Sequence, residues 1–154
     1  MLGRTYENQI CSIARTLEVV GERWSLLIIR DAFLGLKRFE EFRASLGVAR
    51  NVLTERLNRL VDEGILERAR YQERPTRYEY RLTSKGGELG TAVIALLQWG
   101  DRHLAGEAGP PRLVEHADCG GKVVAQLVCD KCGKAIGPHE VELKPGPALR
   151  ELAA

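Results

Sequence analysis

The chain has 154 residues, of which 44% are hydrophobic and 29% charged, and its formal net charge is +2. This length and composition predict one globular domain with at most a small appendage, and they exclude a disordered chain. No run of residues approaches the roughly 20 apolar positions that a membrane-spanning helix needs. Glu7 and Asn8 also interrupt the place where a secretion signal would have its apolar segment. We therefore expect a soluble, cytoplasmic protein with no membrane partner.

Charge is distributed unevenly along the chain. Residues 1–105 hold 17 Lys and Arg against 14 Asp and Glu, whereas residues 106–154 hold 6 against 7. Within the first part, residues 67–81 carry five arginines and three glutamates. A local arginine cluster favours a surface that meets a polyanion. The alternative is an ordinary solvated hairpin.

Four helices are predicted in the first 63 residues. Apolar residues recur every three or four positions in residues 11–20, 24–35, 39–46 and 50–63. Glycines follow these segments, as they commonly do at helix ends. The last two helices are short and are separated by a turn that contains Gly47. This is the layout of a helix-turn-helix.

After residue 63 the spacing of apolar residues changes from the helical period of three or four to the strand period of two. Residues 65–71 and 78–82 alternate between apolar and polar side chains, and Pro75 suits the turn between them. A hairpin directly after a helix-turn-helix is the order of a winged helix. Thr83 can cap a further helix, whose apolar residues lie within 88–104 and whose first turns are weakened by Gly86, Gly87 and Gly90. The predicted fold is mainly α with a small β component.

A glycine- and proline-rich stretch at residues 106–111 indicates a linker. We place a winged helix-turn-helix with dimerisation helices at residues 1–105, a linker at 106–115 and a small β-rich module at 116–148. Apolar alternation at residues 123–128 and 141–143 predicts short strands in this module.

The helix at residues 50–63 has a polar face opposite its leucine stripe. Recognition helices read base edges with residues near their N-terminal end, and Asn and Arg pair with adenine and guanine. The candidate base-reading residues are Arg50, Asn51, Thr54, Glu55 and Asn58. Arg59 is a candidate phosphate contact, and Arg74 and Arg77 at the hairpin tip are candidates for the DNA backbone or a minor groove. The alternative is a polar solvent face on an ordinary amphipathic helix.

Several segments in chain order resemble one family: residues 11–31, RFEEF at 38–42, NVLTERL at 51–57 and YEYRLTSKG at 78–86. They are similar to the HxlR-type transcriptional regulators, which are winged helix-turn-helix proteins related to the MarR type. The resemblance implies a homodimer on double-stranded operator DNA, joined through its N-terminal and long C-terminal helices. Ala49-Arg50 stands where the family often has Ser-Pro, and Ser12 follows Cys11 where the family usually has proline.

Surplus apolar residues also predict a dimer, because a small winged core cannot cover them all. They are Ile10, Ile13, Leu17, Leu89, Val93, Leu96 and Trp99. Cys11 matches the cysteine that some family members use to sense quinones, aldehydes or disulfide stress. It is therefore a candidate redox sensor, and a packed, inert cysteine is the alternative.

The module at residues 116–148 contains candidate metal ligands in two pairs, His116-x2-Cys119 and Cys129-x2-Cys132. Gly120 and Gly133 follow the pairs, as the turns of a zinc knuckle require. Four N and S ligands suit a structural, tetrahedral zinc ion, and the pattern resembles a zinc ribbon with one cysteine replaced by histidine. His139 is an alternative fourth ligand. A ribbon that has lost its metal, with thiols or a disulfide, is the other interpretation.

These observations favour a sequence-specific DNA-binding regulator and not an enzyme. One alternative is a thiol-disulfide protein that uses Cys129-Asp-Lys-Cys132, although the expected strand-helix-strand order is missing. Another is a protein-interaction module on a helical dimer scaffold. The sequence does not identify an operator or a small-molecule effector.

Overall fold

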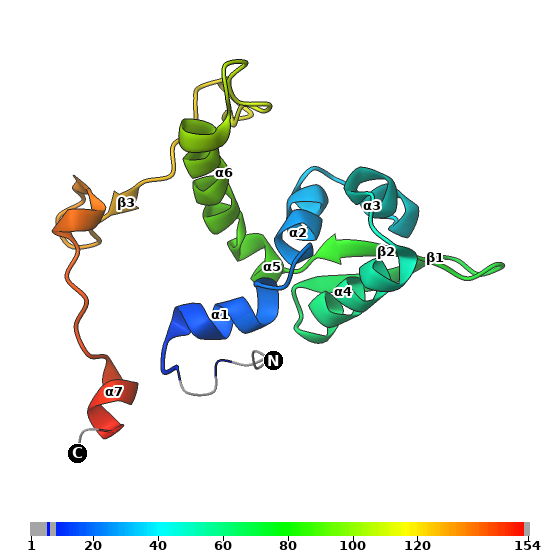
Figure 1. The fold of residues 1–154 in the computed structure, drawn as a ribbon, viewed down its shortest axis with the longest axis horizontal. Helices are drawn as coiled ribbons and strands as arrows, with labels where there is room; N and C mark the ends of the chain where they lie inside the picture. Colours follow the sequence, from blue (N-terminus) through cyan, green and yellow to red (C-terminus); the bar gives the residue numbers. More distant parts are fainter. Residues whose placement is uncertain (1–5, 7–8, 153–154) are drawn as a thin grey trace. The chain divides into compact units, whose positions relative to one another are not determined.

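In the computed structural model, residue 6 and residues 9–152 are described, and the chain divides into two compact units, Met1–Val93 and Ile94–Ala154. The first unit contains four helices, a hairpin and a short fifth helix (Figure 1). These are α1 (Ser12–Val20), α2 (Ser25–Phe33), α3 (Phe39–Leu46), α4 (Arg50–Asp62), β1 (Leu66–Gln72), β2 (Arg77–Leu82) and α5 (Ser84–Glu88). Helix α6 (Gly90–Leu104) starts in this unit and continues into the second. The division lies before the linker expected at residues 106–115.

The helix-turn-helix forms where the sequence predicts it. Helix α3 has the predicted bounds, and α4 ends one residue before the predicted end. Gly47 and Gly64 follow them with φ of +62° and +68°. Glycine adopts this left-handed conformation without the clash that a Cβ atom would cause, so both helices end where a glycine is available.

One hydrophobic core joins these elements. Its most buried side chains come from α2, α3, α4 and β1, and they are Ile28, Ile29, Phe42, Leu53, Leu57, Leu60 and Leu66. Tyr80 of β2 closes the core against Phe42, with their ring centroids 6.5 Å apart and the rings nearly perpendicular. Burial of each such side chain contributes about 1.5–3 kcal/mol. The core therefore holds α4 and the hairpin in fixed positions.

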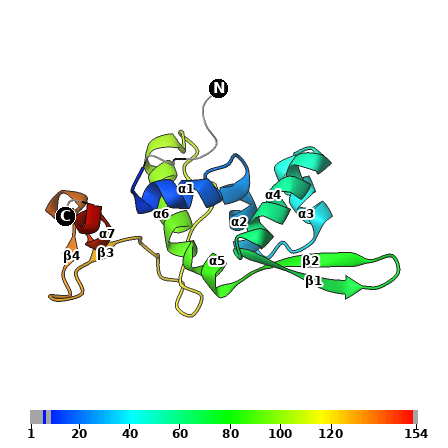
Figure 2. The same ribbon diagram turned by 90° about the horizontal axis from the view of Figure 1, so that it is seen from below.

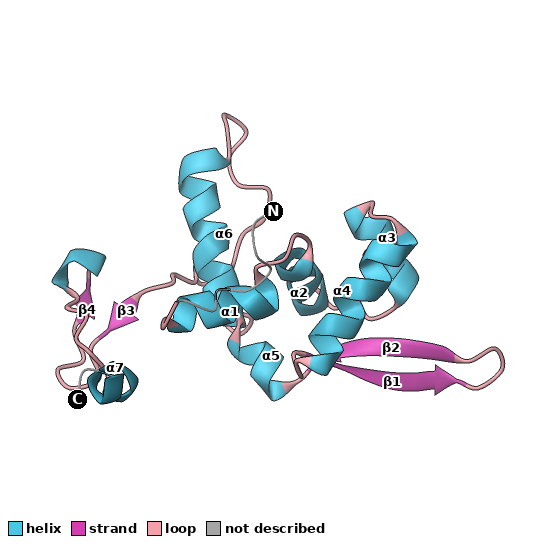
Figure 3. Cartoon of the chain, turned by 60° about the horizontal axis from the view of Figure 1, so that its bottom comes forward, coloured by secondary structure: helices cyan, strands magenta, loops and turns pink. Residues whose placement is uncertain are grey.

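The antiparallel hairpin β1–β2 extends beyond the helices as a wing (Figures 2 and 3). Its base is fixed by a third segment: the amide N–H of Tyr80 donates to the carbonyl oxygen of Lys37 at 2.7 Å. Arg38 and Glu79 form an adjacent antiparallel bridge. The segment that leads into α3 thus pairs with the wing, which couples the wing to the helix-turn-helix.

The single helix predicted between the Thr83 cap and Leu104 is divided into two. Helix α5 ends at Glu88, and α6 begins at Gly90. Thr83 caps α5 as predicted, because its hydroxyl oxygen accepts a hydrogen bond from the amide of Gly86 at 3.1 Å. A Cβ atom at position 86 would lie 2.1 Å from the carbonyl oxygen of Ile65. Glycine is therefore required where α5 approaches the backbone of Ile65, the residue before β1.

The second unit has little regular structure beyond α6. Strands β3 (Leu127–Val128) and β4 (Ala135–Ile136) pair antiparallel, followed by a 3-10 turn, η1 (Pro138–Glu140), and α7 (Pro147–Leu152) (Figure 3). Of the strands expected at residues 123–128 only Leu127–Val128 forms, and residues 141–143 are irregular. No side chain whose exposure is described between residues 94 and 151 is buried. Without a core, apolar alternation has no face to pack against, so the prediction of further strands is wrong.

Within the described residues, no helix has the length and hydrophobicity that would let it cross a bilayer.

Candidate nucleic-acid interface

Helix α4 presents a polar face opposite its buried leucines. Leu53, Leu57 and Leu60 have no exposed surface. The six predicted contact residues of this helix are all exposed: Arg50, Asn51, Thr54, Glu55, Asn58 and Arg59. The helix begins at Arg50, and Ala49 provides no side-chain cap. The predicted face is therefore accessible along its whole length.

These residues differ in how strongly they are already engaged. The Thr54 hydroxyl donates to the carbonyl oxygen of Arg50 at 2.8 Å, and Arg59 pairs with Glu63 at 2.8 Å. Among the described residues, the amides of Asn51 and Asn58 have no hydrogen-bond partner. Their donors and acceptors are therefore available to a ligand.

Arg50 is held by α3. Its guanidinium group forms an ion pair with Glu40 and lies 5.0 Å from the ring centroid of Phe39. The hydrogen bond from Arg50 lowers the pKa of the Glu40 carboxyl group, and Arg43 contributes in the same direction. A base or phosphate that binds Arg50 must therefore compete with Glu40. Residue types and spacing did not predict this pairing, because it depends on how the two helices cross.

Arg56 is a structural residue that the sequence interpretation missed. Its side chain is only 17% exposed and pairs with Glu22 at 3.1 Å and with Glu55 at 3.6 Å. Glu22 precedes α2, so this contact fixes the middle of α4 against the segment between α1 and α2.

The wing separates its arginines into two groups. Arg70 pairs with Glu73 at 3.5 Å, Arg81 pairs with Glu79 at 3.0 Å, and Arg68 lies over the ring of Tyr78 at 4.4 Å. Arg74 lies in the turn at the tip and Arg77 starts β2, and both are exposed. In the part of the chain that the structure describes, neither has an acidic partner. The two tip arginines are thus accessible, and their contact with DNA stays a prediction.

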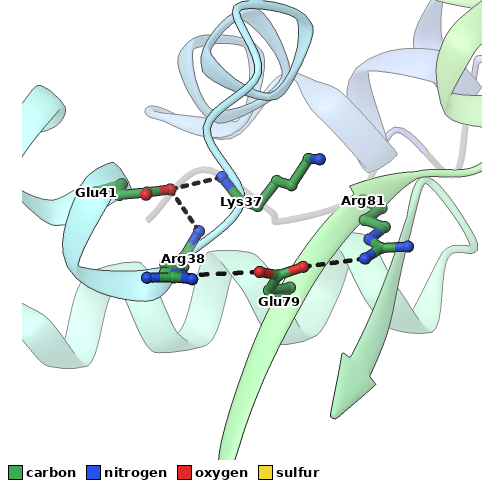
Figure 4. A network of polar contacts seen from close by, with 5 residues as sticks. All are labelled: Lys37, Arg38, Glu41, Glu79 and Arg81. Atoms are coloured by element: carbon green, nitrogen blue, oxygen red, sulfur yellow. Dashed lines mark hydrogen bonds and ion pairs between the residues drawn. The ribbon is translucent and has the colours of Figure 1, made fainter. Parts of the chain in front are cut away.

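A network of charged groups connects the wing to α3 (Figure 4). The carboxylate of Glu41 accepts hydrogen bonds from the backbone N–H groups of Lys37 and Arg38, both at 2.8 Å. These bonds, that from Lys37 first, lower the pKa of Glu41 because they stabilise its charged form. Glu79 of β2 lies between Arg38 at 3.6 Å and Arg81 at 3.0 Å.

A groove of about 620 Å³ lies between the starts of α3 and α4 and the wing. Three arginines from three different elements line it: Arg38 before α3, Arg50 on α4 and Arg77 on β2. Phe39, Tyr71 and Tyr78 add aromatic walls. Glu40 and Glu41 also line the groove, and Glu40 pairs with Arg50. The structure therefore brings two of the predicted contact residues, Arg50 and Arg77, to one groove in which three arginines outnumber two glutamates.

Cys11 is exposed and occupies the N-cap position of α1. Its side chain makes no capping hydrogen bond. A sensing role for Cys11 stays a prediction.

The predicted zinc ligands lie in two separate turns. The Nδ1 atom of His116 is 3.2 Å from the sulfur of Cys119, and Cys129 and Cys132 flank the turn between β3 and β4. Among the described residues, no three His, Cys, Asp or Glu side chains gather closely enough to hold a metal ion. The structure thus forms each pair but does not bring the four ligands together, and His139 lies in η1.

The turn at residues 129–132 favours a thiolate. Backbone N–H groups of Cys132 and Lys131, and the Cys132 side chain, lower the pKa of Cys129. This turn joins two strands, whereas a redox Cys-x-x-Cys opens a helix in a strand-helix-strand unit. The geometry therefore differs from that of a thiol-disulfide enzyme.

Comparison with known proteins identifies a family whose profile matches this chain. The profile of the family described as HxlR-like helix-turn-helix matches residues 19–108. A helix-turn-helix-type transcriptional regulator of Mycobacterium tuberculosis is 43% identical over 143 residues, which are 93% of this chain and 90% of that protein.

Solved structures that resemble this chain are also those of transcription factors and regulators. One candidate transcription factor matches with a TM-score of 0.81 and 34% identity, over 92% of this chain and 99% of its own. The reduced form of the redox regulator HypR matches with a TM-score of 0.57 and 32% identity, over 60% of this chain and 92% of its own.

The family profile spans α2 to α6, which includes the helix-turn-helix and the wing, and the mycobacterial relative also covers most of the second unit. The fold is the winged helix-turn-helix of MarR-like transcription factors. The chain belongs to the HxlR-like helix-turn-helix family and is a transcriptional regulator.

Proposed function

We propose that this regulator acts as a homodimer on double-stranded operator DNA, with α4 in the major groove and the wing along the sugar-phosphate backbone. The groove between α3, α4 and the wing carries this proposal, because three arginines from three elements line it against two glutamates, beside the exposed polar face of α4. Cationic side chains supply affinity for phosphate, and the polar face supplies contacts to base edges.

The side-chain amides of Asn51 and Asn58 on α4 are the best candidates for recognising the base sequence of the operator. Asn51 lies in the first turn of the helix, which is the part of a recognition helix that reaches base edges. An asparagine amide can bond to adenine through both its donor and its acceptor. Asn58 has the same chemistry two turns later, and Arg50 joins the readers once it leaves Glu40.

The apolar surface of the helices supports a dimer. Exposed apolar residues occur on α1, where Ile13 is 70% and Leu17 is 39% exposed, and on α6, where Leu96 is 56% and Trp99 is 52% exposed. Leu89 and Val93, which the sequence also assigned to this surface, pack instead against the core of the first unit. Burial of the remaining side chains against a second copy would remove apolar surface from water. Light scattering at micromolar protein should give twice the monomer mass of 17.1 kDa, and a monomer would contradict the proposal.

The DNA proposal is tested by first isolating the genomic fragments that the purified protein retains and sequencing them. On the operator defined in this way, Asn51→Ala should lose about 1–3 kcal/mol at one base position and relax the preference there. Gln126→Ala replaces an exposed amide of the second unit and should change neither affinity nor preference. Equal effects of the two substitutions would contradict the assignment of α4 as the reading helix.

A further inference from the structure

The C-terminal part of the second unit is too sparsely packed to hold its own shape. Its hairpin consists of two strands of two residues each, and no described side chain between residues 94 and 151 is buried. Val124, Val128 and Leu143 are 66%, 62% and 94% exposed. An isolated hairpin is at best marginally stable in water, and natural modules of this size use a metal or disulfides to compensate for a missing core.

Two turns in this unit have the same backbone geometry. In the first, the amide of Gly120 donates to the carbonyl oxygen of His116 at 2.8 Å. In the second, the amide of Gly133 donates to the carbonyl oxygen of Cys129 at 2.9 Å. Gly120 and Gly133 have φ of +68° and +69°. Each turn thus presents its two candidate ligands, three positions apart, in the same way.

The first turn has the arrangement of a metal-binding pair. His116 Nδ1 and Cys119 Sγ are 3.2 Å apart, and zinc bond lengths place neighbouring N and S ligands of a tetrahedral site about 3.6 Å apart. The amide of Gly121 donates to Cys119 Sγ at 3.4 Å, and a Cβ atom at position 121 would crowd that sulfur at 3.2 Å.

The other ring nitrogen of His116 faces a carboxylate. His116 Nε2 lies 3.7 Å from Asp118 Oδ2. A histidine that binds a metal through one nitrogen usually donates the N–H of the other to such a group, which fixes its tautomer and ring orientation. At 3.7 Å the two groups are just beyond hydrogen-bond distance, so Asp118 is placed to take this role after a small movement, with Nδ1 left as the ligand atom.

We propose that one Zn²⁺ ion joins the two turns, with His116 Nδ1 and the sulfurs of Cys119, Cys129 and Cys132 as its ligands. The donor set, one imidazole and three thiolates, is one that structural zinc sites use. Because the described residues do not gather three ligands, metal binding has to draw the turns together. The segment at residues 120–128 spans up to about 30 Å when extended, so it permits this closure. Folding of residues 116–146 is then coupled to zinc.

The experiment uses the full chain, purified under reducing conditions without chelator. Elemental analysis should find about one zinc per chain, and X-ray absorption should count three sulfurs and one nitrogen around it. Cobalt(II) added to metal-free protein should give the absorption of a tetrahedral thiolate site. No bound zinc, or two ions per chain with two protein ligands each, would overturn the proposal.

Substitutions assign the ligands. Cys129→Ser should abolish stoichiometric zinc, whereas Cys11→Ser removes a thiol outside the candidate ligand set and should retain it. Asp118→Asn should lower zinc affinity by roughly 10–100-fold without changing the ligand count. In the X-ray absorption measurement, the nitrogen ligand of zinc should be missing from His116→Ala and still present in His139→Ala. The reverse result for the two histidines would contradict the ligand set.

Discussion

The two units of this regulator depend on different sources of order. The first unit contains every buried hydrophobic side chain of the described residues, and its helices and wing form close to where sequence patterns predict them. The second unit has no buried side chain among its described residues and forms fewer strands than its pattern predicts. This contrast between the units shows that an alternating apolar pattern produces a strand only where the apolar side chains can pack into a shared hydrophobic core. Where they cannot, the features that the sequence pattern still predicts are local ones, such as the two glycine-containing turns after His116 and Cys129.

The largest expected loss of stability comes from opening a cavity in the core of the first unit. Leu57 is fully buried on α4, so Leu57→Ala should lower the free energy of unfolding by about 2–5 kcal/mol. Leu143 in the second unit is 94% exposed, and Leu143→Ala should change it by less than about 0.5 kcal/mol. Urea denaturation measures both variants. Similar losses would mean that the second unit shares the core.

A pair of neighbouring glycines tests the close approach of α5 to the backbone of Ile65, just before β1. Gly86→Ala should destabilise by about 1–3 kcal/mol, because its Cβ would overlap the carbonyl oxygen of Ile65. Gly87→Ala meets no atom within 4 Å and should be neutral or stabilising by up to about 1 kcal/mol, since alanine is the better helix former. Thermal unfolding distinguishes them, and equal midpoints would contradict the close approach.

The smallest expected change in the free energy of unfolding comes from protonating the Glu41 carboxylate in acid. Its pKa is lowered from 4.5 by the N–H groups of Lys37 and Arg38, so the carboxylate stabilises the fold above that pH. This contribution is lost as the pH falls through the lowered pKa. Glu41→Gln should therefore destabilise at neutral pH by less than about 1 kcal/mol, because solvent screens the exposed group, and the difference should vanish in acid.

The control is a carboxylate of the second unit in a similar contact. Glu140 accepts the amide N–H of Gly137 at 2.7 Å. Glu140→Gln should leave the main unfolding transition unchanged at every pH, because that unit contributes no core to it. A pH-dependent shift of the same size in both variants would show that the two units unfold together.

The fold of the first unit was largely predictable, because its helices combine a clear apolar period with a glycine at the end. Two features were not. Trp24 adopts φ of +84° at the start of α2, a conformation that no local rule assigns to tryptophan. The other is the break between α5 and α6, which lies close to the contact of Gly86 with the backbone of Ile65, and a contact of this kind depends on tertiary structure.

The candidate site was predicted in its residue types but not in its electrostatics. The polar face of α4 and the two tip arginines follow from period and composition. The pairing of Arg50 with Glu40 and the half-buried Arg56 depend on how α4 packs against α3 and against the segment before α2. Spacing singled out the candidate ligand pairs of the second unit because each lies within one turn, but spacing does not determine whether the two turns meet.

The salt dependence of operator binding tests the central claim, that the first unit contacts DNA through α4 and the wing. The logarithm of the affinity should fall linearly with the logarithm of the salt concentration, and each phosphate contact that is removed should reduce this slope by about 0.9. The double variant Arg74→Ala/Arg77→Ala should show the reduced slope, whereas Lys134→Ala/Lys144→Ala in the second unit should keep that of the unaltered protein. An unchanged slope in the wing variant, or the same reduction in both, would contradict the claim.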